Sequence, residues 1–172
     1  DIDDSYEGRI REMYKNMNDN RLNALFGGSP TTHGQLTIMF TEMTKIREEE
    51  ERVVQRTDVW KLMPTALRAF LRVLFFHVFG GGSMKEGKTI VLMDDSRGLC
   101  YVEQYVRLCP ELKERVAVYG SYGKRTQASV SREGKAFIER RFNSESNLGG
   151  DMCKLFIGDS GLFGTGVTFE AV

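Results

Sequence analysis

The 172-residue sequence has few of the residues that build metal sites and disulfide frameworks. It contains two histidines, His33 and His77, which lie far apart and have no acidic or cysteine neighbour at ligand spacing. Its three cysteines, Cys100, Cys109 and Cys153, form no C-x-x-C pair. We therefore expect no metal site and no disulfide. We interpret the cysteines as buried thiols of an intracellular protein in a reducing compartment.

The sequence also lacks an excess of either charge, and it lacks a long apolar run. It has 24 basic and 24 acidic residues, so no overall basic field predicts nucleic-acid binding, and any such contact must come from a local patch. The longest apolar stretch, ALRAFLRVLFFHVF, carries two arginines and is too short to span a bilayer. No signal peptide is apparent, and we expect no membrane contact.

What remains is an ordinary globular composition. Apolar residues make up 41% of the chain and charged residues 28%, and the length is sufficient for one domain with a hydrophobic core. Neither the first residues, DIDDSYEG, nor the last, TFEAV, resemble natural termini. We therefore expect the chain to be a fragment of a longer polypeptide.

Residues 1–63 show a helical pattern. Apolar residues keep helical spacing from Leu36 to Ile46, and the acidic run Glu48–Glu51 follows them. This run is either a solvated helix face or an acidic surface that contacts a partner. We interpret residues 1–63 as a helical insertion or linker ahead of a second region, residues 64–172.

The second region alternates between helices and strands. Pro64 suits the first turn of a helix with an apolar stripe at helical spacing. The stripe consists of Leu67, Phe70, Leu71, Leu74, Phe75 and Val78. Apolar strands follow at TIVLM, RVAVYG and KLFIGD, and they alternate with helices at about residues 97–109 and at SREGKAFIERRF. This alternation predicts an α/β fold with a parallel sheet and flanking helices.

The carboxyl ends of these strands are the expected binding edge, because ligands of parallel sheets bind there. The loops at this edge have the sequences MDDSRG, YGSYGKR and GDSGLFGTG, all rich in Gly, Ser, Asp or basic residues. Small residues let backbone amides approach phosphate closely, and hydroxyls and a few cations add contacts without reading bases. These loops therefore predict a local nucleic-acid contact on a neutral chain.

A competing motif lies just before the first strand. Gly82, Gly87, Lys88 and Thr89 match the phosphate-loop pattern G-x-x-x-x-G-K-[ST], and Asp94 follows them. A phosphate loop needs a strand before it and a helix after it, whereas here the helical stripe comes first and the strand second. At strand rise Asp94 is also roughly 16 Å from Thr89, too far to share a phosphate chain with Lys88. We interpret this loop as a surface turn that leads into the first strand.

Two patterns flank the last strand. The first is F-N-S-x-x-N-x-x-G, and the second is a glycine-rich segment that ends in G-V-x-F. The matching residues are Phe142, Asn143, Ser144, Asn147 and Gly149, then Gly164, Gly166, Val167 and Phe169. With these patterns, the chain from about Pro64 to Val172 resembles the second RecA-like domain of superfamily 2 helicases and translocases. Within that family it is most similar to the nucleoside triphosphatases and early-transcription-factor ATPases of large DNA viruses such as poxviruses.

Two upstream segments also fit this resemblance. KEGKTIVLMDDSRG looks like the family's first strand of this domain, although an Asp pair is a departure from the family's pattern. VAVYGS looks like the strand whose terminal glycine contacts a nucleic-acid backbone. Residues 1–63 have no counterpart in the resemblance.

The resemblance implies a RecA-like fold and a part in an ATP-dependent motor that moves on DNA or RNA in viral transcription or genome processing. It implies nucleotide contacts by motif V, at Gly164, Thr165 and Gly166. The implied nucleic-acid contacts are Asp95, Ser96, Arg97, Gly120, Ser121, Lys124, Arg125, Asp159, Ser160 and Gly161. The implied partners are nucleic acid, the first RecA-like domain, and transcription or virion proteins. The implied location is the host cytoplasm, a viral factory or the virion.

Some parts of the family's catalytic machinery are missing from this sequence. The family's phosphate loop and magnesium-binding acid lie in its first RecA-like domain, and its arginine finger lies in motif VI, a Q-x-x-G-R-x-x-R pattern. We therefore expect ATP and Mg²⁺ to be bound by the complete motor, and this chain alone to have no catalytic residue and no ATPase activity. Two alternatives stay open: a non-catalytic RecA-like binding or assembly module, and a self-contained phosphate-loop protein that uses Gly82–Thr89.

Overall fold

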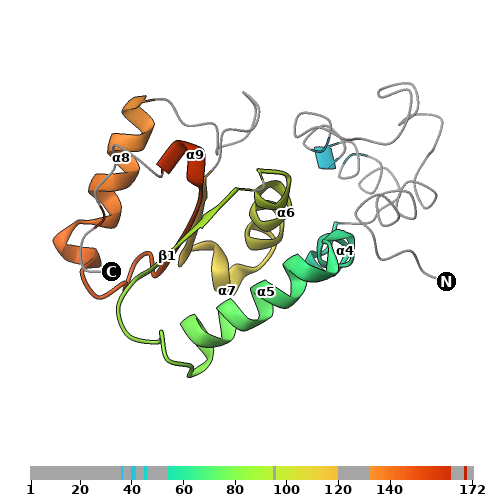
Figure 1. Cartoon of the computed structure of the whole chain (residues 1–172), viewed down its shortest axis with the longest axis horizontal. Coiled ribbons are helices and arrows are strands. Elements are labelled where there is room, and N and C mark those ends of the chain that lie inside the picture. Colours follow the sequence, from blue (N-terminus) through green and yellow to red (C-terminus); the bar gives the residue numbers. More distant parts are fainter. Residues whose placement is uncertain are drawn as a thin grey trace.

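The computed structural model describes residues 54–94, 96–119 and 132–163, together with Leu36, Phe40, Thr41, Lys45 and Phe169. This part is a parallel sheet with helices on both faces (Figure 1). Its elements are α4 (Arg56–Leu62), α5 (Thr65–Phe75), η1 (Phe76–Gly80), β1 (Thr89–Met93), α6 (Ser96–Arg107), α7 (Pro110–Lys113), β2 (Val116–Tyr119), α8 (Arg132–Phe142), η2 (Glu145–Asn147), β3 (Leu155–Asp159) and α9 (Ser160–Phe163).

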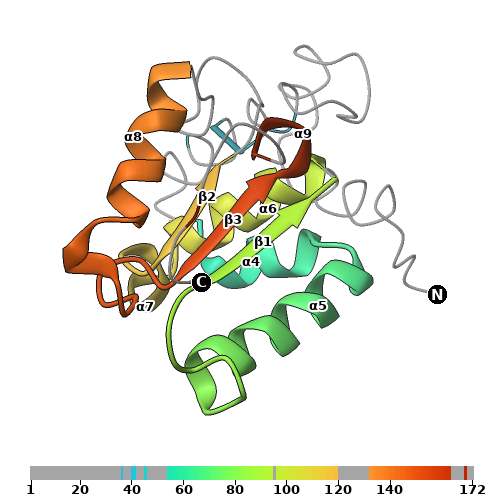
Figure 2. The ribbon, with the colours of Figure 1, turned by 60° about the vertical axis from the view of Figure 1, so that its left-hand side comes forward.

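The described sheet has three strands in the order β1-β3-β2, and both pairings are parallel (Figure 2). The last strand in the chain therefore lies in the middle of the sheet. Met93 pairs with Asp159 on one side of β3, and Tyr119 pairs with Gly158 on the other. Because all three strands run the same way, their carboxyl ends meet at one edge. The predicted α/β fold with a parallel sheet and flanking helices is confirmed.

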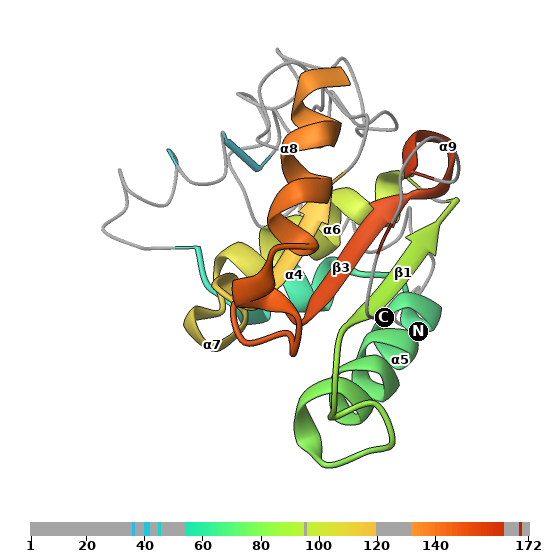
Figure 3. The same ribbon diagram turned by 90° about the vertical axis from the view of Figure 1, so that its left-hand side faces the viewer.

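The helices cover the two faces of the sheet unequally. In Figures 1 and 3, α4, α5 and α6 lie on one side of the sheet, and α8 and α9 lie on the other. The first face carries the larger hydrophobic core, which includes Leu99 and Val102 of α6 and Leu155 and Ile157 of β3. The second carries a small cluster of four buried residues, Ile138, Phe142, Phe156 and Phe163. Strand β3 is buried from Leu155 to Gly158, because both of its faces are covered.

Helix α4 belongs to the same core as the sheet, although it precedes Pro64 in the chain. Its Val59 and Leu62 are buried in the larger core, and α4 packs on α6. The helix begins after Gln55, whose backbone N–H donates to Asp58 Oδ2 at 2.8 Å. The hydrophobic core is thus continuous across the position between Met63 and Pro64.

The first helical segment is described at only a few positions. Leu36 and Phe40 are helical and buried, as their spacing predicts. The acidic run Glu48–Glu51 lies outside the described residues. None of the helices that the structure describes is long and apolar enough to cross a membrane.

The predicted helix after Pro64 is confirmed as α5, but its buried stripe is narrower than the sequence pattern. Leu71, Leu74 and Val78 are buried, whereas Phe70 is 42% exposed. The apolar stripe of the sequence is therefore wider than the buried face of the helix. The helix meets its neighbours along a stripe that does not reach this position, and a six-residue apolar pattern cannot show where that contact ends.

The end of α5 widens into the π-helical turn η1 before the chain reverses. Gly81 follows with a φ of +116°, a conformation that favours glycine. At Gly82 an added Cβ would lie 2.5 Å from the Cα of His77, so no larger residue fits there. The Ser83 backbone N–H then donates to His77 Nδ1 at 3.3 Å. The glycine-rich segment is thus a tight reversal closed on a histidine.

The helix predicted at about residues 97–109 is confirmed as α6. It begins at Ser96 and ends at Arg107, two residues before the expected end, and Pro110 then opens the short helix α7. Cys100 and Cys109 are buried and Cys153 is half-buried, and all three are free thiols. The prediction of buried cysteines is confirmed for Cys100 and Cys109, and Cys153 is only partly buried.

Candidate nucleic-acid interface at the carboxyl edge of the sheet

The first and third predicted loops lie next to each other at the carboxyl edge of the sheet. Strand register places Met93 opposite Asp159, so the residues that follow them, Asp94 and Ser160, are neighbours. The Ser160 hydroxyl donates a hydrogen bond to Asp94 Oδ1. The sheet thus brings together two segments that lie 66 residues apart in the sequence.

The chain leaves these two neighbouring strands in opposite directions. After β1 it enters α6, which packs on the face of the larger core. After β3 it enters α9, whose Phe163 packs edge-on against Phe156 on the other face, with ring centroids 5.0 Å apart. In open parallel sheets, ligands bind at the carboxyl ends where the chain diverges in this way.

The described part of this edge carries both charges. Asp94 is exposed and Asp159 half-buried, while Arg97 is exposed at the start of α6. The first turn of α6 also directs backbone N–H groups toward the edge. Two acids beside one arginine weaken the attraction to a polyanion. Strong binding to nucleic acid therefore needs further cations, and the sequence that follows β2 contains Lys124 and Arg125.

Of the predicted nucleic-acid contacts, the structure describes Ser96, Arg97, Asp159, Ser160 and Gly161, and it brings all five to the carboxyl edge. The other predicted contacts lie outside the described residues. They are Asp95, Gly120, Ser121, Lys124 and Arg125, and the predicted nucleotide contacts Gly164, Thr165 and Gly166 also lie outside them. Their roles stay predictions.

Lys88 lies at the opposite, amino end of the sheet. It is only 4% exposed, and its Nζ donates to the Phe142 carbonyl at 2.8 Å. The ammonium also lies 4.5 Å from the centre of the Phe142 ring. The turn at Gly87 is confirmed by its φ of +78°, but the expectation of a surface turn is wrong for Lys88. The sequence pattern could not show that the loop before β3 would cover this lysine.

The F-N-S segment has a structural function that the sequence did not reveal. Asn147 is fully buried, and its amide makes four hydrogen bonds. Its Nδ2 donates to the carbonyls of Phe142 and Cys153 at 2.9 and 3.0 Å. Its Oδ1 accepts from the N–H groups of Met152 and Cys153 at 3.1 and 2.8 Å. This one side chain closes the loop that leads into β3.

Gly150 fits this loop against the turn before β1. Its φ is +78°, and an added Cβ would come within 2.9 Å of the Gly87 carbonyl oxygen. Lys154 also joins the two segments, because Thr89 N–H donates to its carbonyl at 2.8 Å and its own Nζ donates to the Lys85 carbonyl. The Gly82–Thr89 segment, which resembles a phosphate loop, thus packs against the loop before β3, which contains the F-N-S pattern.

Within the described ranges, no group of three or more histidine, cysteine, aspartate or glutamate side chains could hold a metal ion. Comparison with known proteins finds no match: no family model, no curated protein and no solved structure is similar to the chain.

Proposed function

We propose that the chain is the track-binding half of an ATP-dependent motor that moves along nucleic acid. The hydrogen bond between Ser160 and Asp94 is the observation that supports this most, because it joins the loops after β1 and β3 at the edge where parallel sheets bind ligands. Strand β2 lies on the other side of β3, so an extended backbone crossing this edge would pass the carboxyl ends of all three strands.

The residues of this edge would make different kinds of contact with a phosphate backbone. Arg97 supplies a cation to a phosphate, and the backbone N–H groups at Ser160 and Gly161 supply donors. Lys124 and Arg125 add the cations that a neutral chain needs locally. None of these groups requires a particular base, so the proposed contact follows the backbone of the track.

In this proposal the nucleotide belongs to the complete motor. Motif V follows α9 directly in the sequence, and Gly164, Thr165 and Gly166 are the residues that would contact ATP. ATP hydrolysis with Mg²⁺ would supply the free energy of movement. The proposed setting is viral transcription or genome processing.

The geometry opposes the self-contained phosphate-loop alternative. Lys88 is buried on the Phe142 carbonyl and lies at the amino ends of the strands, away from the carboxyl edge. The non-catalytic module has the same fold as the proposed motor half. The two differ only in function, because the non-catalytic module would not couple nucleic-acid binding to ATP hydrolysis.

The track contact is testable with the chain alone. A fluorescent single-stranded oligonucleotide of about twenty nucleotides is titrated with the chain at several salt concentrations. We expect binding that weakens with salt, and Arg97→Ala should reduce the magnitude of the slope of log affinity against log salt by about 0.7, the value of one phosphate contact.

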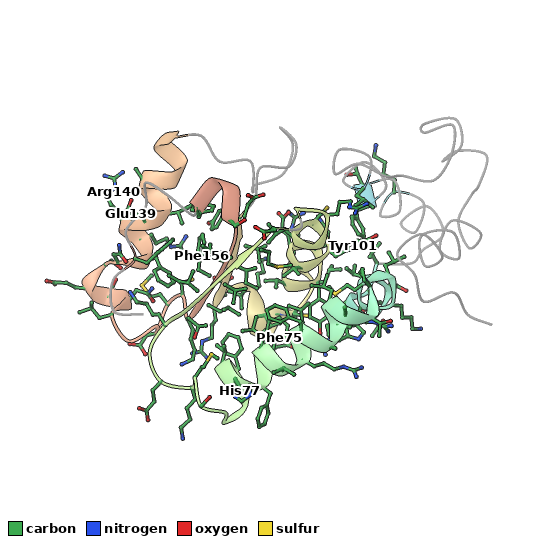
Figure 4. The ribbon with its side chains drawn as sticks, viewed as in Figure 1. Phe75, His77, Tyr101, Glu139, Arg140 and Phe156 are labelled. Atoms are coloured by element: carbon green, nitrogen blue, oxygen red, sulfur yellow. The ribbon has the colours of Figure 1, made fainter. Side chains whose placement is uncertain are left out.

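Arg140→Ala is the matched control, because Arg140 is exposed on the outer side of α8, away from the edge (Figure 4). This variant should leave both affinity and salt slope unchanged. Equal effects of the two arginine variants, or no oligonucleotide binding at low salt, would contradict the proposal.

A further inference from the structure

A cleft of about 420 Å³ lies along β2, at the edge of the described sheet. Strand β2 forms its floor from Val116 to Tyr119. Helices α6 and α7 supply one wall, and α8 supplies the other. Its volume falls within the range of ligand sites in proteins. The cleft lies beside the strand, whereas the candidate nucleic-acid loops lie at the strand ends.

The floor of this cleft presents backbone hydrogen-bonding groups. The Arg115 carbonyl accepts from Lys154 and Leu155 N–H at 2.9 and 3.2 Å, so Arg115 bonds toward β3. Neighbouring residues of a strand direct their backbone groups to opposite sides. The N–H and C=O groups of Val116 and Val118 therefore point away from β3 and into the cleft. No described strand pairs with β2 on that side.

Charged side chains surround these backbone groups. Glu103 is buried, and its Oε1 accepts from Arg107 Nη2 at 2.9 Å, so these two charges neutralise each other. Arg141 of α8 and Lys113 of α7 also line the cleft, and neither has an ion-pair partner among the described residues. Glu114 is a single acid beside them. The unpaired groups on the walls therefore have a net positive charge.

The wall on the side of α8 is apolar. Ile138 and Phe142 of α8 face the sheet there, and the small side chain of Ala117 leaves space between α8 and β2. A binding partner thus meets paired backbone donors and acceptors, an apolar wall and two unpaired cations. An extended polypeptide offers all three complementary features, because its side chains alternate and its backbone matches that of a strand.

We propose that β2 binds an extended peptide segment of a protein partner as a further strand, and that this segment alternates apolar and acidic residues. Its backbone pairs with Val116 and Val118. Its apolar side chains pack against Ile138 and Phe142, and its carboxylates reach Arg141 and Lys113. Charges over a strand edge also protect against aggregation. Such protection does not require the open volume beside the strand, and the proposed segment fills it.

The test uses the full chain labelled with ¹⁵N and an acetylated six-residue peptide of alternating valine and glutamate. We expect saturable binding with slowed hydrogen exchange at the amides of Val116 and Val118. The matched control is the same peptide with alternate backbone nitrogens methylated, which keeps the side chains and removes strand pairing. It should bind at least about tenfold more weakly, because two strand hydrogen bonds are lost.

Charge reversal on the protein tests the second part of the proposal. Arg141→Glu should lower the affinity for the valine–glutamate peptide about fivefold and raise the affinity for a valine–lysine peptide. Arg140→Glu, on the outer side of the same helix, should change neither affinity. Equal binding of the methylated peptide, unprotected amides at Val116 and Val118 at saturation, or protection of these amides by inorganic phosphate or an oligonucleotide instead would each overturn the proposal.

Discussion

The two ends of the sheet differ in how they use polar residues. At the amino end, Lys88 and Asn147 are buried and form their hydrogen bonds within the protein. At the carboxyl end, Asp94 and Arg97 are exposed, and Ser160 bonds to Asp94 near the surface. A buried polar group must be satisfied internally or it destabilises the fold, whereas an exposed one is available to a ligand.

This difference changes the meaning of the motifs. Gly87 and Lys88 match a nucleotide-site pattern by letter, yet their groups hold the loop before β3 in place. The acidic and serine residues after the strands match no strict pattern, yet the fold brings Asp94 and Ser160 together at its carboxyl edge. Variants at the amino end should therefore change stability, and variants at the carboxyl end should change binding.

Asn147→Ala should have the largest effect. It removes four hydrogen bonds from a fully buried position, and it leaves the Cys153 N–H without its partner, so we expect a loss of about 3 kcal/mol in the free energy of unfolding. Chemical denaturation followed by circular dichroism measures this loss. Ser146→Ala, an exposed change in the same loop, is the control and should cost less than about 0.5 kcal/mol. Similar losses for both variants would show that the buried hydrogen bonds of Asn147 stabilise the protein no more than an exposed side chain of the same loop.

Gly150→Ala should follow, with a loss of about 2 kcal/mol. The left-handed backbone disfavours any side chain, and the new Cβ would press on the Gly87 carbonyl oxygen at 2.9 Å. The neighbouring Gly149→Ala is the matched control, because its Cβ would meet only the side chain of Asp151, with Oδ2 at 3.4 Å. Equal unfolding free energies for the two variants would contradict the expectation that the close approach of Gly150 to Gly87 limits the side chain at this position.

A reciprocal pair compares the two ends directly. Lys88→Met should lower the free energy of unfolding by about 1 kcal/mol, since Asn147 still bonds the Phe142 carbonyl, and should leave oligonucleotide affinity unchanged. Asp94→Asn should change stability by less than about 0.5 kcal/mol and raise oligonucleotide affinity about threefold, because one repulsive charge is removed. Denaturation and fluorescence titration of both variants test this. Loss of oligonucleotide binding in Lys88→Met would instead indicate that the Gly82–Thr89 loop binds a ligand.

Cys153 offers the smallest effect. Burial raises the pKa of its thiol above the ordinary value, so little thiolate is present at neutral pH. Its alkylation by iodoacetamide at pH 7.5 should therefore be slower than that of free cysteine, and should accelerate as pH rises above the ordinary thiol pKa. Labelling followed by mass spectrometry measures the rates. A rate equal to that of free cysteine would show that the amino end opens readily.

Much of the local structure could be predicted from the sequence, because it depends on nearby residues. The apolar runs at TIVLM and KLFIGD form β1 and β3, and the helix expected at about residues 97–109 is α6. The exposure of Phe70 could not be predicted, since helical spacing shows which residues share a face but not how far the neighbouring elements extend over it. Asn147 was recognised as part of a motif, but its four hydrogen bonds depend on how the loop closes.

The sequence by itself determined the α/β class, the parallel direction of the strands and the order in which helix and strand surround Lys88. These follow from apolar periodicity and from the connections that parallel strands require. Only the tertiary structure decided that β3 lies between β1 and β2, that Asp94 meets Ser160, and that Lys88 is buried. Each of these depends on contacts between segments far apart in the chain, and no local pattern encodes which pairs will meet.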